Sequence, residues 1–350
     1  MKETMTSRER WMAVLSGQKP DRIPLDFSAV SEVPVKILRE TGLSDMEAFF
    51  EKYHVDYLEY VEPKFTGVPR VPGASPFGVT FREVQYENGK YRETDGHPLE
   101  GYESLDEIIE NYSFPDPDDF DFSCIKDQLK GKERRPTAYH AARIFSLMRS
   151  LRGDIQSYID LIEEPEIVKY LSDKATDFFC EMIVRTFESA PKGSLDIIRI
   201  SEDMGGMNGL LFRREIFLDM FWSNIKRMCD CIHSCGAKVF LHSCGAIYDV
   251  IGDFVSAGAD ILDPIQWKCG GMQRERLKAE FGDKIAFHGS MDNQHTMVFA
   301  SPDEVRAEVR DNIRLLGPRL VLTSCHTLQV ASPVENIIAM YEEGYSSGWL

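Results

Sequence analysis

Two potential metal ligands, His242 and Cys244, follow a short apolar run at residues 238–241. Successive side chains of an extended chain point to opposite faces, so residues two apart leave the same face and can bind one ion. Gly245 then allows the chain a tight turn away from the site. Imidazole nitrogen and thiolate sulfur are ligands that suit zinc. The spacing therefore predicts half of a zinc site at the end of a strand.

A further pair of donors, Cys325 and His326, follows another apolar run at residues 320–322. Three protein ligands leave one coordination position of zinc free for a substrate, which favours a catalytic rather than a structural ion. Adjacent residues of an extended segment point to opposite faces, so only one of the two is expected to bind. The sequence leaves both choices open.

A second cysteine group, Cys229, Cys231 and Cys235, begins in a segment at residues 225–233 that has the pattern of a helix. Residues two apart on a helix do not face each other, so this group is expected to be a poor chelate. The eight cysteines of the chain, with no secretion signal at residues 1–4, fit reduced thiols better than a disulfide scaffold.

Two adjacent carboxylates, Glu202 and Asp203, follow an apolar segment at residues 196–200. A carboxylate here can be a fourth zinc ligand, a proton donor to a leaving oxygen or a substrate anchor. The alternative is a helix cap. Only one of the two need face inward, and Asp203 is the preferred one. Together with His288, which follows residues 285–287, they are the predicted catalytic residues.

Four further polar residues are predicted to contact a substrate: Gln266 and Asp292, which follow predicted strands, and Tyr139 and His140, which end the stretch at residues 135–138. Gln266, Asp292 and also His288 can instead orient a metal ligand through a hydrogen bond. For Tyr139 the alternative is a packed ring whose hydroxyl finds a partner elsewhere.

Short β-branched runs alternate with amphipathic helical stretches from about residue 136 onward, which is typical of repeated βα units and a parallel sheet. The predicted strands are 196–200, 238–241, 260–262, 285–287 and 320–322, after an early strand at 22–27. Residues that could bind a metal or take part in catalysis follow these strands rather than precede them. In a parallel α/β barrel such loops all meet at one face. We therefore predict an (α/β)8 TIM barrel, with a doubly wound open sheet as the alternative.

The barrel is predicted to take up the whole chain, 1–350, as a single domain with a helical and irregular N-terminal extension. Residues 6–15 carry a Ser/Thr cap and then apolar residues at helical spacing, closed by Gly17. Residues 60–135 are irregular, with short β-like pieces and a proline-rich stretch, and we interpret them as an insertion or subdomain.

Composition excludes several classes of partner. A net charge of -17 repels a phosphate backbone, and no Lys/Arg stripe offsets it, so nucleic acid is not an expected partner. No apolar run approaches the length that spans a bilayer, so no membrane association is expected. The N-terminus lacks the apolar stretch of a signal peptide, and we expect a cytoplasmic protein.

The chain resembles the uroporphyrinogen decarboxylase superfamily, and within it the branch of corrinoid-dependent methyltransferases. The resemblance rests on residues 7–17 with 20–24, on the turn at 241–245 and on residues 332–337. The decarboxylase itself carries an arginine-rich Met-Arg-Gln-Ala-Gly-Arg motif, which does not occur near residues 27–35. The methyltransferase branch instead implies a barrel fold and zinc bound by His242, Cys244 and either Cys325 or His326.

This resemblance implies an enzyme that moves a methyl group between a small molecule and the cobalt of a corrinoid carried on a separate protein. The small molecule is a methyl donor, such as a methoxylated aromatic compound in an O-demethylase reaction, or a thiol acceptor. Two alternatives stay open: a metal-free decarboxylase acting on a tetrapyrrole, and a noncatalytic module that binds a tetrapyrrole or a corrinoid protein. A homodimer and a monomer are both compatible with the sequence.

Overall fold

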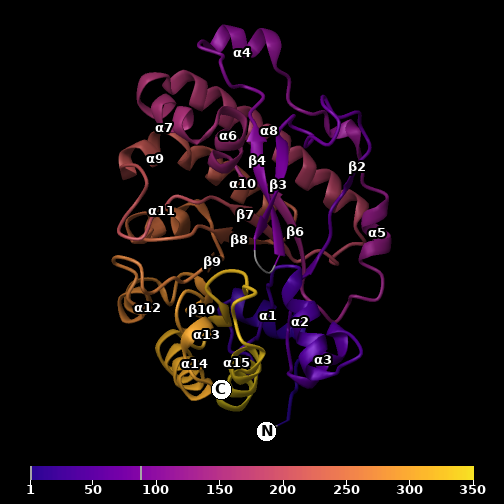
Figure 1. Ribbon diagram of the computed structural model, residues 1–350, viewed down its shortest axis with the longest axis vertical. Helices are drawn as coiled ribbons and strands as arrows, with labels where there is room; N and C mark the ends of the chain where they lie inside the picture. The colour runs from indigo at the N-terminus through magenta and orange to yellow at the C-terminus, as the bar shows by residue number, and fades with distance from the viewer. Residues whose placement is uncertain (1, 87–88) are drawn as a thin grey trace.

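The computed structural model describes residues 2–86 and 89–350 and centres on a parallel sheet of seven strands (Figure 1). Successive barrel strands are neighbours, in the order β1-β6-β7-β8-β9-β10-β11. Their bounds are β1 Glu59–Tyr60, β6 Thr137–Ala142, β7 Ile197–Ser201, β8 Lys238–His242, β9 Ile261–Asp263, β10 Ala286–Met291 and β11 Leu320–Ser324. The five strands predicted after residue 190 are confirmed, with small differences at their ends.

Residues Pro24, Leu25 and Asp26 close this sheet into a barrel. The Leu322 amide of β11 donates to the Pro24 carbonyl at 2.9 Å, and the Asp26 amide donates to the Leu322 carbonyl at 3.0 Å. On the other side, the Asp56 amide donates to the Leu25 carbonyl at 2.5 Å. This segment takes the eighth position, and the predicted (α/β)8 barrel is confirmed. It forms isolated bridges rather than a continuous strand, because Pro24 has no N–H and the Leu25 amide donates to the Asp56 carboxylate.

Helices between the strands cover the outside of the barrel (Figure 1). One of them, α14, begins at a capping box, in which the Ser301 side chain accepts from the Glu304 amide and Glu304 accepts from the Ser301 amide. The helices are α6 Phe145–Arg152, α7 Asp154–Glu163, α8 Pro165–Ser189, α9 Arg214–Met220, α10 Trp222–Ser234, α11 Tyr248–Ala257, α12 Arg274–Phe281, α13 Thr296–Phe299, α14 Pro302–Leu316 and α15 Val334–Ser347.

The amino-terminal end of the barrel is plugged by α1 (Ser7–Leu15), which confirms the helix predicted at residues 6–15. Thr6 and Glu9 form its capping box. The buried Trp11 of α1 donates from Nε1 to the Asp56 carbonyl at 2.7 Å. It packs on one small or apolar residue from each of six strands: Ala138, Ile197, Phe240, Ile261, Ala286 and Val321.

The chain leaves the barrel between β1 and β6. In this stretch β3 (Thr80–Tyr86) and β4 (Gly89–Gly96) form an antiparallel hairpin. The other elements here are β2 Lys64–Phe65, α4 Leu105–Asn111, a short 3₁₀ helix at Pro117–Asp119, β5 Phe120–Asp121 and α5 Cys124–Gln128. Before β1, the chain forms α2 (Glu32–Thr41) and α3 (Met46–Lys52). Among the described residues, no helix is both long and apolar enough to cross a bilayer.

Candidate metal centre

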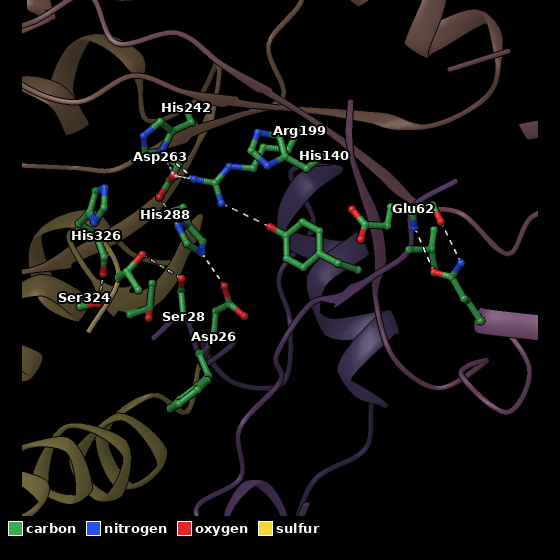
Figure 2. Close-up of a pocket in the computed structure, with 16 residues that line it drawn as sticks. Asp26, Ser28, Glu62, His140, Arg199, His242, Asp263, His288, Ser324 and His326 are labelled. Carbon is green, nitrogen blue, oxygen red and sulfur yellow. Dashed lines mark hydrogen bonds and ion pairs between the residues drawn. The ribbon is translucent and has the colours of Figure 1, made fainter. Parts of the chain in front are cut away.

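The inward-facing residues of the barrel strands form an apolar layer and a polar layer. Side chains alternate along a strand, so the next inward residue lies two positions beyond each plug residue and nearer the carboxyl end. These second-layer residues line a cavity of about 480 Å³ at the barrel mouth (Figure 2). The six that follow the plug residues are His140, Arg199, His242, Asp263, His288 and Thr323. Burial of the apolar layer therefore fixes which polar residue of each strand points into the cavity.

Three of the predicted metal ligands, His242, Cys244 and His326, bring their ligand atoms within 4.8 Å of one another. The Nε2 atom of His242 lies 3.4 Å from the Sγ atom of Cys244. Zinc bonds of about 2.0 to 2.3 Å place tetrahedral ligands about 3.5 Å apart. The three donors therefore fit one zinc ion after a small inward movement. No other such group of His, Cys, Asp and Glu occurs in residues 2–86 and 89–350.

The Asp263 carboxylate sets the orientation of the His242 ring. Its Oδ2 atom contacts the Nδ1 atom of His242 and accepts a hydrogen bond from Arg199 Nη2 at 3.0 Å. A carboxylate only accepts, so Nδ1 of His242 carries a proton, and Nε2 is the ring nitrogen that faces Cys244. Hydrogen-bonded carboxylates of this kind orient the histidine ligands of zinc sites.

His288 continues this buried network on the other side of Asp263. Its Nδ1 atom lies 2.5 Å from Asp263 Oδ1, and its Nε2 atom lies 2.9 Å from Asp26 Oδ2. Burial lowers the pKa of His288, but the two carboxylates outweigh it and raise that pKa to about 9. A protonated His288 between two carboxylates therefore holds Asp263 in place beside His242.

The opposite wall of the cavity carries Tyr60, Glu62 and His140. Nε2 of His140 lies 2.9 Å from the Ser201 hydroxyl. Burial lowers the pKa of His140 to about 3, and the nearby Arg199 cation acts in the same direction. The imidazole is therefore neutral at physiological pH. His140 lines the cavity where the sequence analysis placed a substrate contact.

Asp203 lies at the rim of the site. Its Oδ1 atom accepts from the Cys244 amide at 3.1 Å and lies 3.5 Å from His242 Nε2. The side chain is 47% exposed, so it can also reach a bound molecule. The neighbouring His242 lowers the pKa of Asp203 most, and the hydrogen bond from the Cys244 amide acts in the same direction. Of the two adjacent carboxylates, Asp203 is the one beside the potential metal ligands.

Glu202 does not line the cavity, although the sequence predicts a catalytic role for it. Its buried carboxylate accepts hydrogen bonds from the amides of Ile144, Phe145 and Ser146, the last two at 2.9 and 3.4 Å. These amides begin α6, whose unpaired N–H groups favour an anion. Burial raises the pKa of Glu202 to about 7. The alternative considered from the sequence, a helix cap, describes this residue, although the capped helix is α6.

The structure brings His326, not Cys325, to the other two ligands. Strict alternation after Val321 and Thr323 would turn Cys325 inward, but β11 ends at Ser324 and the chain turns there. The buried Cys325 thiol instead lies 2.9 Å from the Ile265 carbonyl oxygen. The choice that the sequence left open is therefore decided by the end of the strand.

Three predicted substrate contacts lie outside the cavity lining. Gln266 accepts from the Gly245 amide at 2.6 Å, so it supports the turn after Cys244. Asp292 lies 2.5 Å from Lys268 Nζ and accepts from amides of its own loop. Tyr139 is buried on the outer face of β6, one position out of phase with His140. None of these three residues lines the cavity, and their contact with a substrate stays a prediction.

Sequence analysis assigned no role to several lining residues, among them Arg199, Asp263, Tyr60 and Glu62. Arg199 could have been predicted from the sequence, because a charged residue inside an otherwise apolar strand indicates a position that points into the barrel. Asp263, at the end of β9, follows the same inward alternation. Tyr60 and Glu62 gave no such signal, because β1 has only two residues and lies in a stretch without periodicity.

The chain is an α/β barrel that carries three potential metal ligands at its mouth, of which His242 is buried and His326 is exposed. The sequence pattern of the uroporphyrinogen decarboxylase (URO-D) family matches residues 136–345, more than half of the chain. The chain belongs to the uroporphyrinogen decarboxylase family. No curated protein sequence matches it.

Among solved structures, the chain is similar to a methyltransferase from Methanosarcina mazei, with a TM-score of 0.68 and 16% identity. The match covers 98% of this chain and 99% of the methyltransferase. At this identity the likeness shows a shared fold over the full length. A D-tagatose 3-epimerase-like protein matches more weakly, with a TM-score of 0.38, 13% identity and coverage of 69% of this chain and 92% of that protein.

Proposed function

We propose that this protein is a zinc-dependent methyltransferase that moves a methyl group between a small molecule and the cobalt of a corrinoid held by a partner protein. The small molecule is a methyl donor, such as a methoxylated aromatic compound, or a thiol acceptor. One observation carries the proposal: the donor atoms of His242, Cys244 and His326 surround one point beside a cavity at the barrel mouth. Three ligands leave zinc a position for the small molecule.

The residues around this point have separable tasks. Asp263 keeps the proton of His242 on Nδ1, so that Nε2 is free to bind metal. When bound, zinc supplies Lewis acidity toward a methyl donor, or lowers the pKa of a thiol acceptor. At the rim, Oδ1 of Asp203 is placed to hold or release a proton next to the ligands. The cavity wall orients the small molecule.

The residues that line the cavity favour methyl transfer over porphyrinogen decarboxylation. A tetrapyrrole with several carboxylates needs several cations around it. In the described part of the chain, Arg199 is the one Lys or Arg that lines the cavity, and its guanidinium already donates to Asp263 at 3.0 Å. A small methyl donor or acceptor is also compatible with a cavity of about 480 Å³.

Zinc content across single variants tests the ligand set. We expect about one zinc per chain in the native protein. His326→Ala and Cys244→Ala should each lose it. Cys325→Ala is the matched control, since it removes a thiol from the adjacent position, and it should retain the metal. Zinc lost from Cys325→Ala but kept by His326→Ala would overturn the assignment.

Methyl transfer itself is tested with Co(I) cobalamin and a panel of methoxylated aromatic donors, read as the absorbance of methyl-cobalt. The reverse direction uses methyl-cobalt and a panel of thiols. The native protein should turn over in one direction, and Cys244→Ala should not. If zinc binds as expected and neither direction gives turnover with a purified corrinoid carrier, the protein is a binding module.

A further inference from the structure

Helices α8 and α10 run side by side on the outside of the barrel (Figure 1). An ion pair joins them where Arg227 Nη2 lies 2.5 Å from Asp177 Oδ1. One turn further on, Cys231 of α10 meets Cys180 of α8, and its Sγ atom lies 3.7 Å from the Cys180 carbonyl oxygen. The packing of two helices therefore brings together thiols that are far apart in the sequence.

Cys231 is the centre of three half-buried thiols. The thiols of Cys180 and Cys235 lie beside it, and all three cysteines are partly open to solvent. The Cys180 thiol and, more weakly, the Cys235 thiol lower the pKa of Cys231 to about 7, although burial acts in the opposite direction. A thiolate is the nucleophilic form of cysteine, so Cys231 is the reactive member of the group.

Cys229 does not belong to this group, although it lies two residues from Cys231. It is fully buried on another face of α10, where a β-carbon added to Gly258 would lie 3.3 Å from its own Cβ. The poor chelate predicted for the Cys229 and Cys231 pair agrees with these opposite directions. The useful partner of Cys231 comes from α8.

We propose that hydrogen peroxide oxidises Cys231 and that Cys180 then closes a disulfide linking α10 to α8. The Cys231 thiolate attacks one peroxide oxygen, which forms a sulfenic acid and expels hydroxide that becomes water on protonation. The sulfur of Cys180 then attacks the sulfur of Cys231, forms the S–S bond and loses its own proton. The sulfenic oxygen leaves as a second water. Two thiols are oxidised and one peroxide is reduced.

Geometry selects Cys180 over Cys235 as the resolving thiol. A disulfide needs Cβ atoms about 3.5 to 4.5 Å apart. Cys231 and Cys235 lie four residues apart at the end of α10, and helix positions at this spacing keep their Cβ atoms about 5 to 6 Å apart. Closing that pair would deform the last turn of the helix. Cys180 approaches from a different helix, so the fixed spacing along α10 does not apply to it, and the Cys231 sulfur already lies 3.7 Å from its carbonyl oxygen.

The experiment treats the full, zinc-bearing protein with stoichiometric hydrogen peroxide, then alkylates free thiols and maps the peptides without reduction. We expect a linked peptide pair containing Cys180 and Cys231, with two of the eight thiols lost. Cross-linking restricts the unfolded chain, so the thermal midpoint of the oxidised protein should rise and return on reduction.

Serine variants separate the roles of the three thiols. Cys180→Ser should leave a sulfenic acid on Cys231 that a dimedone probe traps, whereas Cys231→Ser should give neither the link nor the adduct. Cys235→Ser should still form the link, and Cys124→Ser, which alters a half-buried cysteine elsewhere, is the matched control. A link between Cys231 and Cys235, a link between two chains, or no link at all would overturn the proposal.

Discussion

Asp263 is the carboxylate that joins His242, His288 and Arg199 at the barrel mouth. Its two oxygens serve His242 and His288, and Arg199 donates to the same carboxylate. Burial raises the pKa of Asp263, but the His288 and Arg199 cations and then His242 outweigh it, so the pKa lies well below its ordinary value. The carboxylate therefore stays ionised although only 4% of the residue is exposed.

Replacing Asp263 with Asn should weaken zinc binding without removing a ligand. The amide can present its NH₂ group to His242, which favours a proton on Nε2, where the metal must bind. Loss of such a hydrogen-bonding partner typically costs about 10- to 100-fold in metal affinity. Competition against a chromophoric chelator measures the change. Asp253→Asn, which alters a surface ion pair with Arg214, is the control. Equal affinity in Asp263→Asn and the native protein would contradict this role.

Sequence alone could identify His242 and Cys244 because a two-residue spacing after a strand carries geometric information. It could not choose between Cys325 and His326, because the choice depends on where β11 ends. Asp263 acts only through its neighbours, and no local pattern identifies a residue whose partners, His242 and His288, lie on other strands. Spatial partners of this kind require the folded barrel.

At the scale of elements, strands with β-branched runs were predictable and irregular ones were not. β7, β8 and β11 are apolar enough to be recognised without their neighbours. The closing segment around Leu25 and the two-residue β1 are defined mainly by hydrogen bonds to other parts of the barrel. The helix that Glu202 caps could not be identified for a related reason, because α6 begins 57 residues before it in the sequence.

Buried ion pairs fix helix α1 and the residues before it to the rest of the protein. Arg10 of α1 is 1% exposed, and it donates from Nε to Asp21 at 2.7 Å and from Nη1 to Asp56 at 2.6 Å. Asp21 also accepts from the amides of Thr4 and Met5. Burial raises the pKa of Asp21, but the Arg10 bond and these amides outweigh it and lower the pKa.

Asp21→Asn should therefore destabilise the fold by about 2 kcal/mol at pH 7, since a buried guanidinium loses part of its charged partner. The folded pKa of Asp21 lies below that of an unfolded aspartate, about 3.9. Its contribution is then fully present above that value and is lost as the pH falls through the folded pKa. Urea unfolding at pH 7 and pH 3 should show the difference between native and variant protein narrowing at pH 3. A constant difference would mean that the effect is not electrostatic.

Along the barrel axis, the apolar residues that stabilise the fold and the polar residues that line the cavity lie at different ends. At the amino end, α1 and the apolar layer around Phe240 close the barrel. Two residues further along the same strand, His242 begins the polar layer. Buried polar groups cost free energy unless their partners are in place. The mouth is therefore the end of the barrel whose stability depends on what binds there.

If the protein binds zinc as proposed, removal of the metal should lower its thermal midpoint, because a ligand that binds only the folded state adds to its stability. Free zinc at about 100 times its Kd contributes about 2.7 kcal/mol. For a chain of 350 residues this corresponds to about 4 °C. Calorimetry with and without a chelator measures the shift, and Cys244→Ala should show none. An equal shift in Cys244→Ala would place the stabilising metal elsewhere in the protein, because that variant lacks one of the three donors of this site.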